Sequence, residues 1–180
     1  MLQRTQFGSY VALDALRVGI IDDSAYFRKL LRTILTAYGI RQIFEASTQN
    51  EALEMVRFQR LDVLLLDWNL GTGGNGMSLI DTVRTHPDRQ ISTQAIVMVS
   101  AYSDKRQVLE AVRLGANDFI VKPVSAKLVY ERLRRLTTTK IVYQRVGNRL
   151  VPVKPAQTKT GFDPTVVIPV STREGSLTFL

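Results

Sequence analysis

Residues 62–70 have the sequence DVLLLDWNL, in which four consecutive apolar residues are followed directly by an aspartate, Asp67. A short apolar run without polar alternation is typical of a strand that is buried on both faces, as strands of parallel sheets are. The aspartate then stands at the carboxyl end of that strand. This stretch predicts a parallel sheet with an acidic group at one edge.

The same pattern, a short apolar run and then a longer amphipathic stretch, recurs on both sides of residues 62–70. Such alternation predicts an α/β fold, a doubly wound parallel sheet with helices on both faces. In the first helix we expect Ser24 to cap the start, Gly39 to end it and Tyr26 to lie on the apolar stripe. We expect strands at 17–21, 42–45, 63–66, 95–99 and 119–121, and helices at 24–38, 49–57, 77–85, 104–114 and 125–136.

Changes in composition divide the chain into three parts: an N-terminal extension, the five βα units and a basic C-terminal extension, at residues 1–15, 16–136 and 137–180. Residues 141–153 are compatible with a hairpin, in which Pro152 would confine its strand to a sheet edge. From Lys154 onward we expect a flexible tail.

The formal net charge of +8 is concentrated near the C-terminus. Residues 1–15 are neutral overall, residues 16–125 hold 13 basic and 12 acidic side chains, and the residues after Ser125 hold 10 basic against 3 acidic ones. Basic charge spread over the whole fold would suggest a polyanion partner. Its position leaves such binding to the part of the chain after Ser125 alone.

Rare residue types exclude several kinds of site. The chain has no cysteine, so disulfides, thiolate metal sites and cysteine nucleophiles are excluded. A single histidine, His86, excludes a histidine metal cluster. No segment reaches membrane-spanning length, and Asp14 and Arg17 interrupt the apolar run near the start. We therefore expect a cytoplasmic protein without a transmembrane segment.

Chemically active groups stand directly after four of the five predicted strands: Asp22 and Asp23 after the first, Asp67 after the third, Ser100 after the fourth and Lys122 after the fifth. The carboxyl ends of parallel strands share one edge of a sheet, so these groups are expected to converge. Three carboxylates repel each other unless a hard dication binds them, and Mg2+ prefers such ligands. The ammonium and hydroxyl groups suit phosphoryl oxygens.

These five residues, with DWN at 67–69 and FIVKP at 119–123, resemble the CheY-like receiver domains of two-component response regulators. The resemblance covers residues 16–136. It implies a flavodoxin-like sheet of strand order 2-1-3-4-5, Mg2+ as cofactor, and a histidine kinase or histidine phosphotransfer protein as the phosphoryl donor.

The resemblance also implies a role for each site residue. Asp67 would be the phosphoacceptor, and Mg2+ would be bound by Asp22, Asp23, Asp67 and the backbone carbonyl of Asn69. The phosphoryl oxygens would be bound by Ser100 and Lys122.

The implied switch consists of Ser100 and Phe119, which would move together on phosphorylation. This movement would change the surface of the fourth helix, the fifth strand and the fifth helix for a downstream protein target, and a homodimer through the fourth helix is a further option. Asn69 and Tyr102 would tune the lifetime of the phosphoryl group, and the bond before Pro123 would be cis.

The stretch GTGGNG at 71–76 matches the pattern G-x-G-x-x-G of dinucleotide sites. In those sites the pattern opens a helix directly after the first strand, whereas here the residues WNL separate it from the third strand. We interpret it as a flexible loop over the phosphorylation site. It departs from the family pattern, which commonly has proline where Gly71 stands.

Three classes of function compete on this sequence. The first is a phosphoacceptor switch that binds proteins; it is not an enzyme beyond its own phosphorylation from a phosphodonor and its autodephosphorylation. The second is a receiver-regulated binder of nucleic acid or an anionic surface through the C-terminal extension. The third, an aspartate-nucleophile phosphatase, would want an acid two residues after Asp67, where Asn69 stands. An isolated Asp-Asp pair is usually a turn or cap, but the joint pattern at the strand ends favours the first class.

Overall fold

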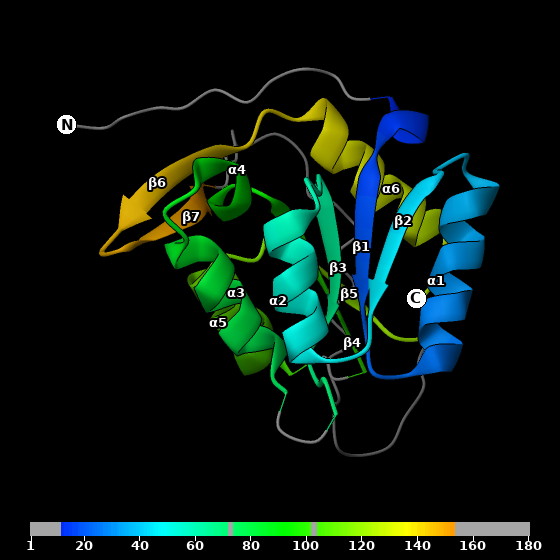
Figure 1. Ribbon diagram of the computed structural model, residues 1–180, viewed down its shortest axis with the longest axis horizontal. Coiled ribbons are helices and arrows are strands. Elements are labelled where there is room, and N and C mark those ends of the chain that lie inside the picture. The colour runs from blue at the N-terminus through cyan, green and yellow to red at the C-terminus, as the bar shows by residue number, and fades with distance from the viewer. Residues whose placement is uncertain (1–11, 72–73, 102–103, 154–180) are drawn as a thin grey trace, which may run out of the picture.

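The computed structural model of the chain describes residues 12–71, 74–101 and 104–153. Five strands form one all-parallel sheet in the order β2-β1-β3-β4-β5, which confirms the predicted order (Figure 1). The order reverses between β1 and β3, so these two strands lie side by side. The strands are β1 Arg17–Ile21, β2 Gln42–Ala46, β3 Val63–Asp67, β4 Ala95–Ser100 and β5 Asp118–Val121.

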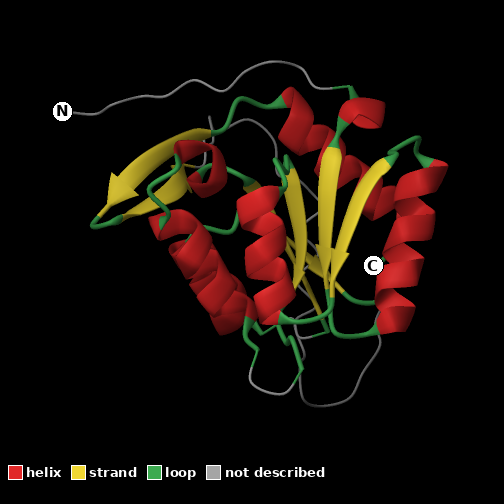
Figure 2. Cartoon of the chain, viewed as in Figure 1, coloured by secondary structure: helices red, strands yellow, loops and turns green. Residues whose placement is uncertain are grey.

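Helices cover both faces of the sheet, as Figure 2 shows. Helices α1 and α6 pack on one face, and α2, α3 and α5 pack on the other. Within the described residues no helix combines the length and apolar character that a membrane crossing requires. The five long helices are α1 Ala25–Ala37, α2 Gln49–Phe58, α3 Gly76–Thr85, α5 Lys105–Leu114 and α6 Ala126–Thr138.

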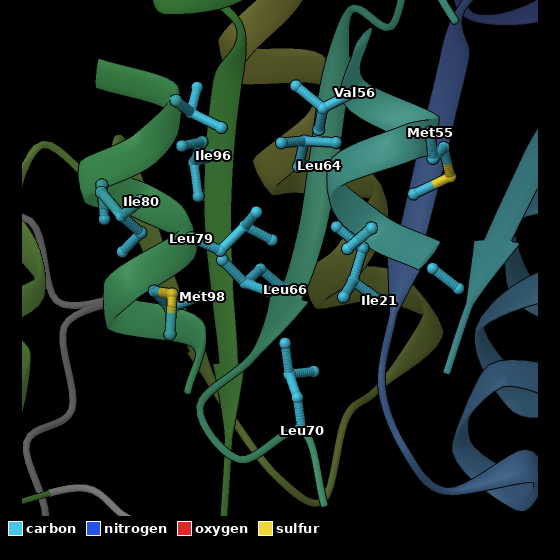
Figure 3. Close-up of a cluster of buried hydrophobic side chains, with 14 of the residues drawn as sticks. Ile21, Met55, Val56, Leu64, Leu66, Leu70, Leu79, Ile80, Ile96 and Met98 are labelled. Atoms are coloured by element: carbon cyan, nitrogen blue, oxygen red, sulfur yellow. The ribbon is translucent and has the colours of Figure 1, made fainter. Parts of the chain in front are cut away.

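Strand β3 shows why the fold needs a continuous apolar run. All five of its residues are buried. Leu64 and Leu66 face α2 and α3, where they meet Leu79 and the side chains of β4 (Figure 3). Val63 and Leu65 face the opposite core beneath α1 and α6. A central parallel strand therefore buries both sets of alternating side chains.

Local signals in the sequence set the helix ends. The Ser24 hydroxyl accepts a hydrogen bond from the Phe27 amide at 3.4 Å, and Gly39 follows α1 with a φ of +87°. Both features confirm the sequence analysis. The prediction for Tyr26 is wrong, because this side chain is 73% exposed. The buried residues of α1 are Leu31, Ile34 and Leu35, so its contact with the core lies beyond the first turn, where Tyr26 stands.

Two short helices were not predicted, η1 Leu13–Ala15 and α4 Arg89–Ser92. The Asp88 carboxylate caps α4 by accepting from the Gln90 amide at 2.8 Å. One helical turn is too short to show apolar periodicity, so the sequence pattern did not reveal it. Because α4 intervenes, the helices predicted at 104–114 and 125–136 are α5 and α6.

A hairpin follows the last helix. Strands β6 Val142–Val146 and β7 Arg149–Val153 pair antiparallel, at the place where the sequence was compatible with a hairpin. Tyr143 and Leu150 are buried, and Arg149 forms an ion pair with Asp81 of α3 at 2.8 Å. The hairpin is thus packed against α3. Residues 1–11 and the tail predicted from Lys154 lie outside the described residues.

A buried arginine joins the hairpin to the domain. The Arg84 side chain of α3 is 1% exposed, and burial lowers its pKa. Its guanidinium lies 5.2 Å from the centre of the Tyr143 ring. Among the described residues its acceptors are neutral: the backbone carbonyls of Gly115, Ser92 and Gln94 and the side-chain carbonyl of Asn117, at 2.8 to 2.9 Å. These bonds compensate the charge and tie together α3, α4 and the start of β5.

Candidate functional site

The groups predicted to converge lie at the carboxyl edge of the sheet. Ile21 is in register with Leu66, so Asp22 stands beside Asp67 at the point where the strand order reverses. On the other side of β3, β4 ends at Ser100, whose carbonyl accepts from the Lys122 amide at 2.8 Å. Ligand sites of open parallel sheets form at such a reversal.

The three carboxylates Asp22, Asp23 and Asp67 form a compact group. Each offers an oxygen, and these oxygens all lie within 4.8 Å of one another. Asp22 and Asp67 are buried, whereas Asp23 is exposed. Hard, closely spaced oxygen donors with access from solvent fit Mg2+, which binds few carboxylates and keeps several waters. The residues present therefore fit the metal that the sequence predicted.

Lys122 supplies the balancing positive charge. Its Nζ lies 2.8 Å from Asp22 Oδ2 and 3.2 Å from Asp67 Oδ2, and the side chain is only 11% exposed. A third contact is with the ring of Phe27 in α1, whose centre is 4.0 Å from Nζ. The ammonium is thus held by two carboxylates and one aromatic face.

The start of α1 fixes the acidic loop. The Asp22 carboxylate accepts from the Ser24 amide at 2.9 Å. Arg28, one turn further along, donates through Nη1 to the backbone carbonyls of Asp22 and Asp23, at 2.8 and 3.2 Å. Its guanidinium also pairs with Glu45 of β2 at 3.4 Å. The backbone of both Asp22 and Asp23 is therefore held in place by a residue of α1.

Part of the glycine-rich loop lies beside the carboxylates. A Cβ built on Gly71 would lie 3.6 Å from Asp23 Oδ2, and one built on Gly76 would lie 2.2 Å from the Asp67 carbonyl oxygen. The Gly76 amide donates to the Trp68 carbonyl at 2.8 Å. Gly76 starts α3, so the loop closes back on the strand that carries Asp67.

A model of the response regulator receiver domain matches residues 18–134. The chain belongs to this family. Family membership implies a phosphoacceptor function in two-component signalling.

Several known chemotaxis proteins are similar to this chain. The chain is 29% identical to the chemotaxis protein CheY of Pseudomonas aeruginosa over 121 residues, which cover 67% of this chain and 95% of that protein. Its identity to CheY of Thermotoga maritima is 30%, over 67% of this chain and 97% of that protein. Among solved structures, Vibrio cholerae CheY4 is similar with a TM-score of 0.62 and 25% identity, covering 67% of this chain and 98% of that one.

Within the receiver, the remaining predicted residues occupy distinct environments. Ser100 is fully buried at the end of β4, and Phe119 is half-buried in β5, packed against the core beneath α2, α3 and α5. Asn69 is exposed in the loop after Asp67. The bond between Lys122 and Pro123 is cis, as the resemblance implied. Tyr102 lies outside the described residues.

The environment of Asp67 disfavours its ionised form. Burial raises the pKa of this carboxyl above its ordinary value, and the neighbouring charge of Asp22 raises it further. Lys122 and the Trp68 amide, which donates to Oδ1 at 2.8 Å, lower it in part. A divalent cation beside these carboxylates would offset the two raising effects.

Phe27 and Arg28 were not identified from the sequence. Both stand within six residues of Asp22, but their contacts depend on how α1 is oriented at the edge of the sheet. An aromatic and a basic residue just after an N-cap that follows an acidic pair are the only signal, and that signal is weak.

A cavity of about 570 Å3 lies elsewhere in the receiver. It is lined by Asp62 and Ala95 at the amino ends of β3 and β4, and by Tyr143 of the hairpin. The carboxylates lie at the opposite, carboxyl end of the sheet, so this cavity is separate from the acidic site.

Proposed function

We propose that Asp67 accepts a phosphoryl group from a histidine kinase or a histidine phosphotransfer protein in a Mg2+-dependent reaction. The observation that carries this proposal is the position of the Lys122 ammonium between the carboxylates of Asp22 and Asp67. A cation at this place can move from a carboxylate oxygen to a phosphoryl oxygen without leaving the site.

In the proposed reaction a carboxylate oxygen of Asp67 attacks the phosphorus of a phosphohistidine. The bond between phosphorus and the imidazole nitrogen breaks, and its electron pair stays on the imidazole, which takes a proton from solvent. Lys122 and Ser100 bind phosphoryl oxygens. Asp22, Asp23, Asp67 and the Asn69 carbonyl would hold Mg2+, which when bound supplies charge neutralisation at the transferring group.

The proposed output is protein binding. A phosphoryl group beside Ser100 draws its hydroxyl towards the new oxygens, and Phe119 moves into the space that is left. This rearrangement changes the surface of α5, β5 and α6, where Leu109 of α5 is 47% exposed. We propose a downstream protein as the target, with homodimerisation through α5 as a second outcome of phosphorylation.

We propose that the protein is a phosphoacceptor switch and not an enzyme for other substrates. Its chemistry is limited to self-phosphorylation from phosphodonors and autodephosphorylation, whose rate Asn69 and Tyr102 would tune through water access. A chain without cysteine fits a reducing compartment, and we propose the cytoplasm as its location.

Binding of nucleic acid through the basic C-terminal extension is the second candidate. Within the described part of the extension, Arg149 is already paired with Asp81, and the neighbouring basic residues Arg132 and Arg135 of α6 are paired with Asp118. This pairing reduces the charge available to a polyanion, and we rank the candidate second. A salt-dependent shift of DNA that is lost on truncation after Val153 would favour it.

The proposal is tested by incubating the protein with a small phosphodonor and Mg2+ and measuring intact mass. We expect one phosphoryl adduct on the wild type, none on Asp67→Asn, and an undiminished adduct on the control Asp81→Asn, whose carboxylate lies on α3 away from the site. A wild type without adduct, or an adduct that persists in Asp67→Asn, would refute the proposal.

A further inference from the structure

The ring of Phe27 is fixed against the lysine of the acidic site. Its centre lies 4.0 Å from Lys122 Nζ, within the range of a cation–π contact. The Phe27 amide donates to the capping hydroxyl of Ser24, and the Ser24 amide donates to the Asp22 carboxylate. One turn of chain thus sets the positions of both the aromatic ring and a carboxylate around the same ammonium.

Packing of the hydrophobic core does not account for this ring. Phe27 is half-buried, and the partly buried side chains that pack on the core beneath α1 and α6 include Leu30 of the same helix but not Phe27. Its other aromatic contact is edge-on with Tyr26, which is 73% exposed. The ring therefore faces the acidic site and the protein surface, not the interior.

Among the described residues, the ammonium contacts two carboxylates and one aromatic ring, and these three neighbours differ in chemistry. Asp22 and Asp67 are anions that pair with Lys122: Asp22 can exchange the ammonium for a metal cation, and Asp67 can in addition accept the phosphoryl group. An aromatic face attracts the ammonium through its quadrupole, but it takes no proton and binds no metal. It is the one contact of the three that can stay the same before, during and after phosphoryl transfer.

We infer that Phe27 is a positioning residue for phosphorylation, whose ring face holds the Lys122 ammonium in reach of the acceptor carboxylate while the anionic partners exchange. This inference rests on the proposed function of Asp67. It assigns Phe27 a role through Lys122, without contact to the phosphoryl group itself. An isosteric change that weakens only the ring quadrupole should slow phosphorylation.

The test replaces Phe27 with phenylalanine analogues carrying one, two and three ring fluorines, which reduce the negative potential of the face with little change in shape. The rate of adduct formation from a small phosphodonor is measured by intact mass at saturating Mg2+, together with the thermal unfolding midpoint. We expect the rate to fall in order of fluorine number, by about fivefold for three fluorines, with an unchanged midpoint. Phe27→Tyr, which keeps an aromatic face, should retain the wild-type rate, and Phe27→Leu should be as slow as the trifluoro variant.

The same analogues at Phe58, which is 79% exposed on α2, are the matched control and should leave the rate unchanged. Equal rates across the Phe27 series, or rates that follow the unfolding midpoint and not the fluorine number, would overturn the inference. If the wild type itself forms no adduct, the proposed function fails. If the wild type is phosphorylated and all Phe27 variants react at the same rate, only the role of Phe27 is refuted.

Discussion

Replacing Lys122 by methionine removes the cation of the site but keeps an unbranched apolar side chain. Nζ lies 2.8 Å from Asp22 and 3.2 Å from Asp67. At an effective dielectric constant of about 20 each contact corresponds to about 5 to 6 kcal/mol of Coulomb attraction, before the cost of burying the charges is subtracted. Removing one partner of a buried pair commonly costs about 3 to 5 kcal/mol. We expect Lys122→Met to lose about 3 kcal/mol of unfolding free energy in the absence of Mg2+. This is the lower end of the range, because Asp67 can take up a proton when it loses the neighbouring ammonium.

Metal binding and phosphorylation should respond to this change in opposite directions. Without the ammonium the site is more negative, so Lys122→Met should bind Mg2+ about tenfold more tightly. Its phosphorylation by a small phosphodonor should be slower by about a hundredfold. Urea unfolding with and without Mg2+ and a metal titration followed by the fluorescence of Trp68 measure the first two quantities. Lys127→Met, at a side chain that is 85% exposed on α6, is the control. Wild-type stability combined with unchanged or weaker Mg2+ binding in Lys122→Met would refute the reasoning.

Three further predictions concern burial and backbone contacts. Because the folded pKa of Asp67 is raised, the wild type should lose unfolding free energy relative to Asp67→Asn as pH rises through that pKa in buffers without metal. Urea titrations at several pH values measure this difference, and a difference that grows in favour of the wild type would contradict the prediction. Arg84→Met leaves buried carbonyls without their donor, and in urea unfolding it should lose about 3 kcal/mol of unfolding free energy. The control Arg106→Met, at a side chain that is 91% exposed, should lose less than about 0.5 kcal/mol, and equal losses would show that the Arg84 hydrogen bonds contribute little. Gly76→Ala places a Cβ 2.2 Å from the Asp67 carbonyl oxygen, and this variant should lose about 3 kcal/mol of unfolding free energy and bind Mg2+ more weakly. The control Gly39→Ala has no atom within 4 Å of the new Cβ but a positive φ, so it should lose about 1 kcal/mol and keep its metal binding. Intact metal binding in Gly76→Ala would contradict the prediction and indicate that the loop can adjust.

The sequence predicted the sheet because most of its strands contain a short apolar run, and such runs are rarely anything else in an alternating βα pattern. Strand β2 is the weakest case, since Gln42 and Glu45 are polar. Strand ends were predicted to within one residue; β3, for example, includes Asp67 itself, since its backbone still pairs with β4. Helix α4 was missed because one turn has no period. Tyr26 was misplaced because helical spacing alone does not show which turns of a helix reach the core.

The site was predictable wherever it depends on strand order. Asp22, Asp67 and Lys122 meet because parallel strands bring their carboxyl ends to one edge, a property that the repeat itself encodes. Phe27 and Arg84 were not predictable, since each acts through a partner more than twenty residues away that only the folded chain brings into contact. The contact of the hairpin residue Tyr143 with Arg84 was not predictable for the same reason.

The central claim is that Asp67, at the end of β3, becomes an acyl phosphate when a divalent cation is present. Borohydride reduces an aspartyl phosphate to homoserine, so peptide mass spectrometry after reduction locates the modified residue. We predict homoserine at position 67 after incubation with a phosphodonor and Mg2+, and unmodified aspartate there when the metal is chelated. Homoserine at another aspartate, or equal conversion of position 67 without the metal, would contradict the account.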